Sequence, residues 1–213
     1  KPVVAVITSM AQPLGTHIGN ALEVKDAIDV LAGRTQGDLL EISLLLGSHM
    51  LVLAEKARTL PEARAMLENA LSSGAGLRKL AEMIAAQGGD PRVVEDLSLL
   101  PQAAVKRVMR AETVGYLSAM DTTALGMAAQ RMGAGRAKKS DMLDYSVGYV
   151  LHVRLGDEVT EDTPLATLYA RNEAEAEEAE KAIRKALTIA GEKPSVPPLW
   201  DAVVTAEGII YNR

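Results

Sequence analysis

The sequence has 213 residues, of which 48% are hydrophobic and 24% are charged. This balance is typical of a globular chain with one domain, or a large and a small one, and excludes a disordered chain. The aromatic content of 3% and the net charge of −5 argue against a nucleic acid or an anionic membrane as the binding partner. Because the sequence has no cysteine, disulfides and thiolate catalysis are excluded.

The first half of the chain predicts one strand followed by several helices. The run 3–7 is apolar and β-branched, which is typical of a buried strand. Because it begins directly after Lys1-Pro2 without a start Met, we expect the chain to be a piece of a longer protein. Asn20 is the expected N-cap of the first helix, with Glu23 as its capping-box partner. Helices are predicted over 21–33, 38–53, 61–71 and 76–87, with a short helical turn over 91–97.

The second half predicts a mixed β/α order. Strands are expected over 105–112, 116–120, 147–153, 164–170 and 202–204, and helices over 122–132 and 172–190. If these strands pack against the helices, Leu125, Val147, Val150 and Leu165 should be buried. We therefore predict an α/β (mixed α+β) fold with two domains, over residues 1–104 and 105–213. No apolar run approaches the roughly 20 residues that a membrane span needs.

Few residues show a pattern that predicts catalysis. His17, His49 and His152 lie far apart in the sequence without metal-ligand spacing, so each is interpreted as structural. The glycine-rich basic segment 133–139 follows a predicted helix instead of preceding one, so it lacks the context of a phosphate-binding loop. It is interpreted as a helix stop followed by solvated basic residues, although basic residues here could close over an anion.

The most informative stretch runs from Met10 to Leu31. A loop enters a helix on which Glu23 and Asp26 lie three residues apart, on neighbouring turns of one face. Loop carbonyls plus a carboxylate form a hard-oxygen site that suits an alkali or alkaline-earth cation. The alternative is that the carboxylates only complement the helix dipole.

Several segments together resemble the pyrimidine-nucleoside phosphorylase and thymidine phosphorylase family. They recur in family order over nearly the whole chain: Gln12-Pro13-Leu14-Gly15, residues 18–24, 46–50 and 85–90, Gly133-Ala134-Gly135-Arg136, Asp144-Tyr145-Ser146-Val147-Gly148, Gly156-Asp157 and Pro164-Leu165-Ala166. The resemblance is to the C-terminal half of that family. It implies the remainder of a helix-rich α/β phosphorylase domain followed by a small α/β C-terminal domain.

The resemblance implies a reversible phosphorolysis of pyrimidine nucleosides, with phosphate as co-substrate and no redox cofactor. It places the catalytic residues in the half of the family that this chain does not resemble, so no catalytic residue is expected here. It also implies a structural potassium ion held by the carbonyls of Leu14 and His17 and by the carboxylate of Asp26, where family members usually carry Glu.

By resemblance we further expect a homodimer that binds a nucleoside and phosphate. The absence of cysteine suits a reducing cytoplasm, and the composition and charge argue against a nucleic-acid or membrane partner. Two alternatives stay open. The chain could be a non-catalytic binding or structural domain related to the family, or one half of a split enzyme.

Overall fold

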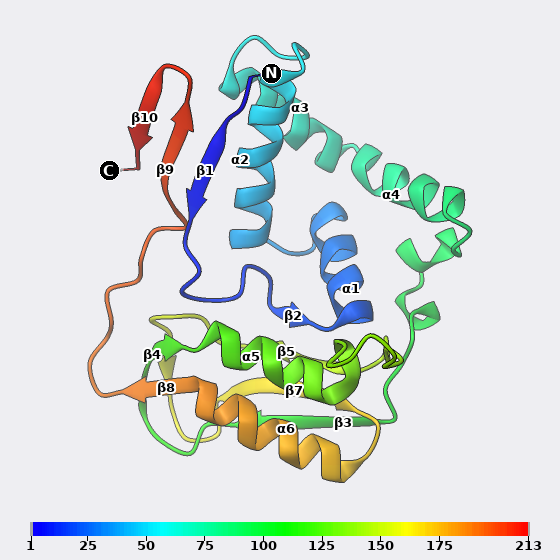
Figure 1. The fold of residues 1–213 in the computed structure, drawn as a ribbon, viewed down its shortest axis with the longest axis vertical. Helices are drawn as coiled ribbons and strands as arrows, with labels where there is room; N and C mark the ends of the chain where they lie inside the picture. Colours follow the sequence, from blue (N-terminus) through cyan, green and yellow to red (C-terminus); the bar gives the residue numbers. More distant parts are fainter. Residues whose placement is uncertain (1, 213) are drawn as a thin grey trace. The chain divides into compact units, whose positions relative to one another are not determined.

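The computed structural model describes residues 2–212 and divides into two compact units. The helical unit comprises residues 1–9, 27–97 and 198–213, and the sheet unit comprises residues 10–26 and 98–197. The predicted mixed α/β fold is confirmed, since both units combine helices with antiparallel sheets (Figure 1). The predicted domain boundary between residues 104 and 105 stays a prediction.

The helical unit packs successive helices around a small aliphatic core. Its helices are the end of α1 (Asn20–Leu31), α2 (Asp38–Leu53), α3 (Leu60–Ser72) and α4 (Ala75–Ala86), followed by the 3-10 turns η1 (Pro91–Val94) and η2 (Leu97–Leu99). Val30, Leu40 and Leu44 are buried at the centre of this core, and Leu67 and Leu71 of α3 pack against them. Apolar residues at helical spacing on these helices therefore form the contact between them.

A three-stranded antiparallel sheet completes this unit. Its order is β1 (Ala5–Thr8), β9 (Trp200–Thr205) and β10 (Gly208–Tyr211). The prediction that residues 3–7 form a buried strand is wrong in its burial. Val3 and Ile7 are 72% and 48% exposed, because β1 is an edge strand whose described partner is β9 alone.

The sheet unit contains two antiparallel sheets. The larger sheet has the order β2 (His17–Ile18), β5 (Gly148–Leu151), β7 (Pro164–Ala170) and β3 (Val105–Arg110). The smaller sheet has the order β6 (Glu158–Val159), β4 (Gly115–Met120) and β8 (Leu187–Ala190). β3 and β4 follow one another in the sequence but lie in different sheets. β3 pairs with β7 from Val105↔Ala170 to Arg110↔Pro164.

Two helices of the sheet unit lie against one another, α5 (Thr122–Ala129) and α6 (Glu173–Ala186) (Figure 1). Asp121 caps α5, because its side chain accepts a hydrogen bond from Ala124 N at 2.9 Å. Residues Gln130–Ala134 continue as a wider helical turn that ends at Gly133 with φ 106°. A single, mainly aliphatic core joins both helices to both sheets and includes Leu125, Val147 and Leu165. All four residues predicted to be buried, these three and Val150, are at most 9% exposed.

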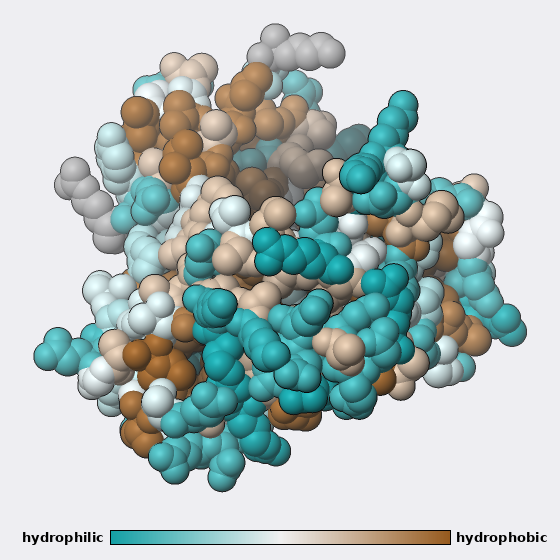
Figure 2. Space-filling view, turned by 60° about the horizontal axis from the view of Figure 1, so that its bottom comes forward, coloured by the Kyte–Doolittle hydropathy of each residue, from teal (hydrophilic) through white to brown (hydrophobic). Residues whose placement is uncertain are grey.

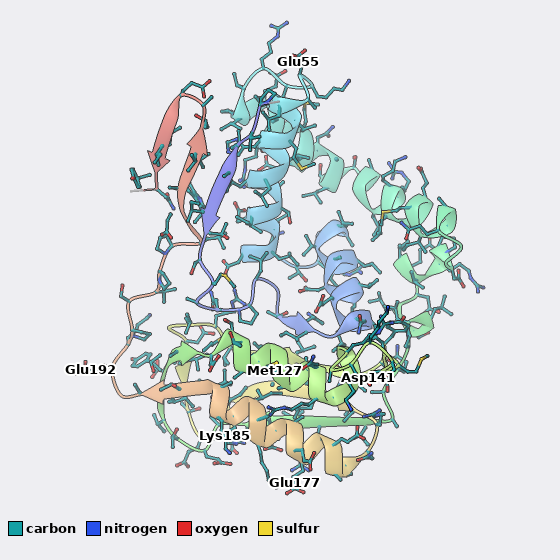
Figure 3. The ribbon with its side chains drawn as sticks, in the orientation of Figure 1. Glu55, Met127, Asp141, Glu177, Lys185 and Glu192 are labelled. Atoms are coloured by element: carbon teal, nitrogen blue, oxygen red, sulfur yellow. The ribbon has the colours of Figure 1, made fainter. Side chains whose placement is uncertain are left out.

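The outer face of α6 is charged. Figure 3 labels Glu177 and Lys185 on this helix, and Asp141 in the loop that follows α5. The Lys181 ammonium donates to Glu177 at 2.6 Å, and the Arg184 guanidinium donates to Glu180 at 2.9 Å. In Figure 2, hydrophilic side chains gather at the front and bottom of the view, beside several hydrophobic patches. The charged run Glu173–Ala186 is typical of a solvated helix face. Among residues 2–212, no helix is both long and apolar enough to cross a membrane.

Candidate functional site

The candidate site lies in the sheet unit, where the loop 10–16 enters β2 and then α1. A close approach of two backbones fixes this entry. Gly19 directly follows β2 and has φ 132°, and Gly148 begins β5 with φ 148°. A Cβ atom on either glycine would collide with a carbonyl of the facing strand, Val147 O or Ile18 O respectively. Glycine at both positions therefore allows β2 to pair with β5 immediately before α1 begins.

The start of α1 is held by bonds that differ from the predicted capping box by one residue. The Glu23 carboxylate accepts from Gly19 N at 3.2 Å, so Gly19 occupies the cap position that Asn20 was predicted to fill. Asn20 is the first helical residue instead, and its side-chain amide donates to Ala134 O at 2.8 Å. Glu23 is therefore engaged at the helix terminus, which leaves Asp26 as the carboxylate to consider on this face.

Asp26 is buried, with 4% of its surface exposed. It lies in the second turn of α1, beyond the first turn in which the helix dipole acts strongly on a charge. Its Oδ1 atom is 3.5 Å from Nδ1 of His17, a long contact, and the same Nδ1 lies 3.0 Å from the Thr16 hydroxyl. A buried carboxylate requires compensation by a cation or by donors. The structure thus brings the His17 ring close to the Asp26 carboxylate, while the predicted role of the His17 carbonyl and Asp26 as cation ligands stays a prediction.

The carbonyl group of His17 points away from the neighbouring strand β5. Leu151 N donates to Thr16 O at 2.8 Å, and His17 faces Val150 in the register. Because successive carbonyls of a strand point to opposite sides, the His17 carbonyl points off the edge of the sheet, away from β5. β2 is the edge strand of this sheet. An oxygen at this place suits a ligand outside the sheet.

Leu14 lies earlier in the same loop and is 40% exposed. Its carbonyl accepts a long contact of 3.5 Å from Nη2 of Arg154, while Nη1 of Arg154 donates to Pro13 O at 2.7 Å. Arg154 was not predicted from the sequence. A single basic residue before a Gly-Asp turn has no distinguishing pattern, and its partners lie about 140 positions earlier in the chain.

The other candidates from the sequence have structural surroundings. His152 contacts the Thr167 hydroxyl through Nε2 at 2.7 Å, and burial together with the Lys106 charge lowers its pKa. Burial lowers the pKa of His49. In the basic segment after α5, Ala137 N and Lys138 N both donate to the Asp141 carboxylate, at 3.1 and 2.8 Å. These bonds are those of a local turn.

Two further hollows lie on the described part of the chain, one in each unit. A hollow of about 250 Å³ between α5 and α6 includes Arg131 and Glu175, but Glu175 already accepts from Arg171 at 2.8 Å. A hollow of about 290 Å³ in the helical unit is lined almost wholly by aliphatic side chains of α1, α2 and α3. Neither offers the convergent polar groups typical of a small-molecule site. In the described chain, no cluster of three His, Cys, Asp or Glu side chains could hold a metal.

The chain is similar to one family of enzymes, both in a family model and in individual relatives. Residues 116–190, inside the sheet unit, match the family model for the pyrimidine nucleoside phosphorylase C-terminal domain. The chain is 49% identical over 173 residues to the pyrimidine-nucleoside phosphorylase of Bacillus subtilis and 48% identical over 173 residues to that of Geobacillus stearothermophilus, covering 81% of this chain and 40% of each relative. It is 42% identical over 201 residues to that of Staphylococcus aureus, covering 94% of this chain and 46% of the relative.

The chain belongs to the pyrimidine-nucleoside phosphorylase family and corresponds to its C-terminal part. It spans less than half the length of the curated relatives that it matches. The family resemblance stated from the sequence segments is thereby confirmed.

Proposed function

We propose that the full-length protein catalyses the reversible phosphorolysis of pyrimidine nucleosides. A nucleoside (thymidine, uridine or deoxyuridine) and phosphate would give the free base and ribose 1-phosphate or deoxyribose 1-phosphate. The observation that carries the proposal is the 42–49% identity to pyrimidine-nucleoside phosphorylases over 81–94% of this chain. In this proposal the chain contributes the C-terminal part of the enzyme, and the groups that touch the reacting atoms come from outside residues 1–213.

This reaction has defined physical requirements. Phosphate must be aimed at C1′ of the sugar, and donors must stabilise the negative charge that develops on the leaving base. Water must be excluded, since it would hydrolyse the sugar in place of phosphate. A C-terminal part can serve these requirements by fixing the loops that border the site and by moving with them on closure.

The candidate site supports a potassium ion as the structural cofactor. Two backbone carbonyls, of Leu14 and His17, and the buried carboxylate of Asp26 are hard oxygen donors of the kind that alkali cations prefer. One carboxylate offsets the charge of a monovalent ion. The ion would join the loop 12–17 to oxygen ligands from outside this chain. Asp26 is shorter than the Glu usual in the family, so a longer contact or a bridging water is expected at this ligand.

A homodimeric assembly and a cytoplasmic location form part of the same proposal. The first rests on the family, and its test is the molecular mass of the full-length protein in solution. The second is supported by the complete absence of cysteine, which suits a reducing compartment.

The deciding experiment is a phosphorolysis assay of the full-length protein. Thymidine, uridine and deoxyuridine are each incubated with phosphate, and release of the base is followed by its ultraviolet absorbance, with phosphate omitted as the control. Phosphate-dependent release of thymine or uracil is expected. If no base is released from any of the three nucleosides, the proposal fails in favour of the non-catalytic binding domain. Activity that appears only on addition of a separate polypeptide would indicate a split enzyme.

A further inference from the structure

A rigid turn of the sheet unit lies against the loop that carries the candidate cation ligands. The turn runs from Arg154 to Asp157, where Asp157 N donates to Arg154 O at 3.1 Å. Gly156 occupies its third position with φ 87°, a conformation that favours glycine there. The Asp157 carboxylate accepts from Arg154 N at 2.8 Å and closes the turn a second time. The backbone of Arg154 is therefore fixed at both of its polar groups.

This turn contacts the loop segment 12–14 through both backbone and side-chain groups. Leu155 N donates to the side-chain oxygen of Gln12 at 2.9 Å. The Arg154 guanidinium donates to Pro13 O at 2.7 Å and reaches Leu14 O at 3.5 Å. Pro13 has no N–H of its own. The guanidinium therefore holds the Pro13 carbonyl directly, and its second nitrogen lies near the next carbonyl along the chain, Leu14 O.

We infer that Arg154 is a positioning residue for the cation site, which holds the loop at Pro13 O and thereby orients the neighbouring Leu14 carbonyl. The inference rests on the potassium site of the proposed function. A carbonyl oxygen has two lone pairs, and the 3.5 Å contact from Nη2 is too long to engage Leu14 O strongly. The short bond at Pro13 O therefore holds the peptide in place, and Leu14 O keeps capacity for a cation.

Two effects of Arg154 on a bound cation oppose one another. Its fixed fork removes loop freedom that the ion would otherwise have to restrict on binding. Its positive charge repels the ion. The repulsion is moderated because the charge is delocalised over the guanidinium and faces two carbonyl dipoles. We infer that the ordering effect is the larger one, so removal of the guanidinium should weaken cation binding.

The test measures potassium binding by full-length protein as the rise of the thermal midpoint with potassium chloride, at constant ionic strength with tetramethylammonium chloride. Arg154→Gln is expected to raise the apparent Kd for potassium at least fivefold. Arg154→Lys, which keeps the charge and can make one bond, should lie between Arg154→Gln and wild type. Arg110→Gln is the matched control, because Arg110 also donates to a backbone carbonyl, Asp162 O at 2.6 Å, outside the cation loop.

The outcomes separate this inference from the proposal on which it rests. If wild type shows no preference for potassium, the cation site itself is wrong, and the inference falls with it, while phosphorolysis can still be measured. If wild type prefers potassium and Arg154→Gln binds it equally well or more tightly, the site stands and the role of Arg154 is wrong. A purely structural role would lower the midpoint of the Arg154 variants equally in both salts. If Arg154→Gln does not fold, the comparison of Arg154→Lys with Arg110→Gln decides.

Discussion

The backbones of Gly19 and Gly148 are in close contact. Gly19 is the residue directly after β2, and Gly148 is the first residue of β5. A Cβ atom on Gly148 would lie 3.0 Å from Cα of Gly19 and would collide with Ile18 O. Since the partner in this contact is backbone, no side chain can rotate away to relieve it. The two glycines thus determine where α1 begins and, through α1, where Asp26 lies.

Gly148→Ala is therefore expected to destabilise the protein. The substitution combines a left-handed φ, which costs about 1–3 kcal/mol in a non-glycine residue, with a steric collision. A loss of at least about 2 kcal/mol in the free energy of unfolding should appear in urea denaturation. Gly126→Ala is the control, because Gly126 lies inside α5 with open space around it. There alanine should stabilise by about 0.5–1 kcal/mol. Equal stability of Gly148→Ala and wild type would contradict the close approach.

Much of the local structure was predictable because local signals agree with the final fold. The strand Pro164–Ala170 has its predicted bounds, and the turn at Gly156-Asp157 follows from a glycine that the turn requires. β8 was not predictable. Leu187–Ala190 continues the helical pattern of α6 without a break signal, and its pairing with β4 converts it into a strand. Tertiary pairing overrides local propensity at this point.

The loop and the helix of the candidate site were predictable from the sequence. The residues from distant parts of the chain that hold this loop and helix in place were not. His17 and Asp26 are nine residues apart, within one loop–helix segment, so their contact follows from local spacing. The N-cap was misassigned by one residue because Asn20 has the cap-forming side chain, whereas the structure requires the left-handed conformation of Gly19 at that place. Arg154 and the Gly148 contact involve partners more than 100 positions away, which no spacing rule connects.

The strand β5 allows a direct test of the core. Val150 is 9% exposed and lies between β2 and β7. Val150→Asp loses about 1.5–3 kcal/mol of hydrophobic stabilisation and also buries a charge, so the sheet unit should unfold or become insoluble. Val108→Asp on β3 is the matched control, because Val108 is 44% exposed and its substitution should change stability by less than about 1 kcal/mol. A soluble Val150→Asp protein with the wild-type thermal midpoint would contradict the assignment.

The lowered pKa values of two histidines lead us to expect that the stability of the protein depends on pH. Burial lowers the pKa of His49 below the usual 6.5, and its Nε2 atom has no hydrogen-bond partner among the described residues. The pKa of His152 is lowered by burial and by Lys106. As the pH falls below about 6.5, the unfolded chain takes up protons that the folded chain resists, so the free energy of unfolding decreases. The double variant His49→Gln, His152→Gln should flatten this slope between pH 7.5 and 5.5 in urea denaturation. A variant with the wild-type slope would show that these side chains do not cause it.

The chain of 213 residues produced by itself is expected to have no phosphorolysis activity, because no catalytic residue is predicted within it. The measurement is release of thymine or uracil from thymidine, uridine and deoxyuridine in the presence of phosphate, with a heat-inactivated sample as the blank. The pyrimidine-nucleoside phosphorylase of Bacillus subtilis serves as the positive control. Base release above the blank would mean that residues 1–213 contain a complete catalytic site.

Substitution of Asp26 tests the cation site against the simpler role of a carboxylate in a helix. A dipole role is worth about 0.3–1 kcal/mol and does not distinguish one monovalent cation from another. A ligand role adds a stabilisation that grows with the free ion concentration as RT ln(1 + [L]/Kd), so it depends on the identity of the ion. Thermal midpoints and phosphorolysis rates of the full-length protein are compared in potassium, sodium and tetramethylammonium chloride at equal ionic strength.

Wild type should be favoured by potassium, and Asp26→Asn should lose most of that preference. Glu23→Gln is the matched control on the same helix, since Glu23 bonds Gly19 N at the helix start. It should lower the midpoint about equally in all three salts and retain the potassium preference. In the chain of 213 residues alone the preference should be weak, because part of the proposed ligand set lies outside it. If full-length wild type is equally stable and active in the three salts, Asp26 does not bind a cation, and its role is limited to the helix and to His17.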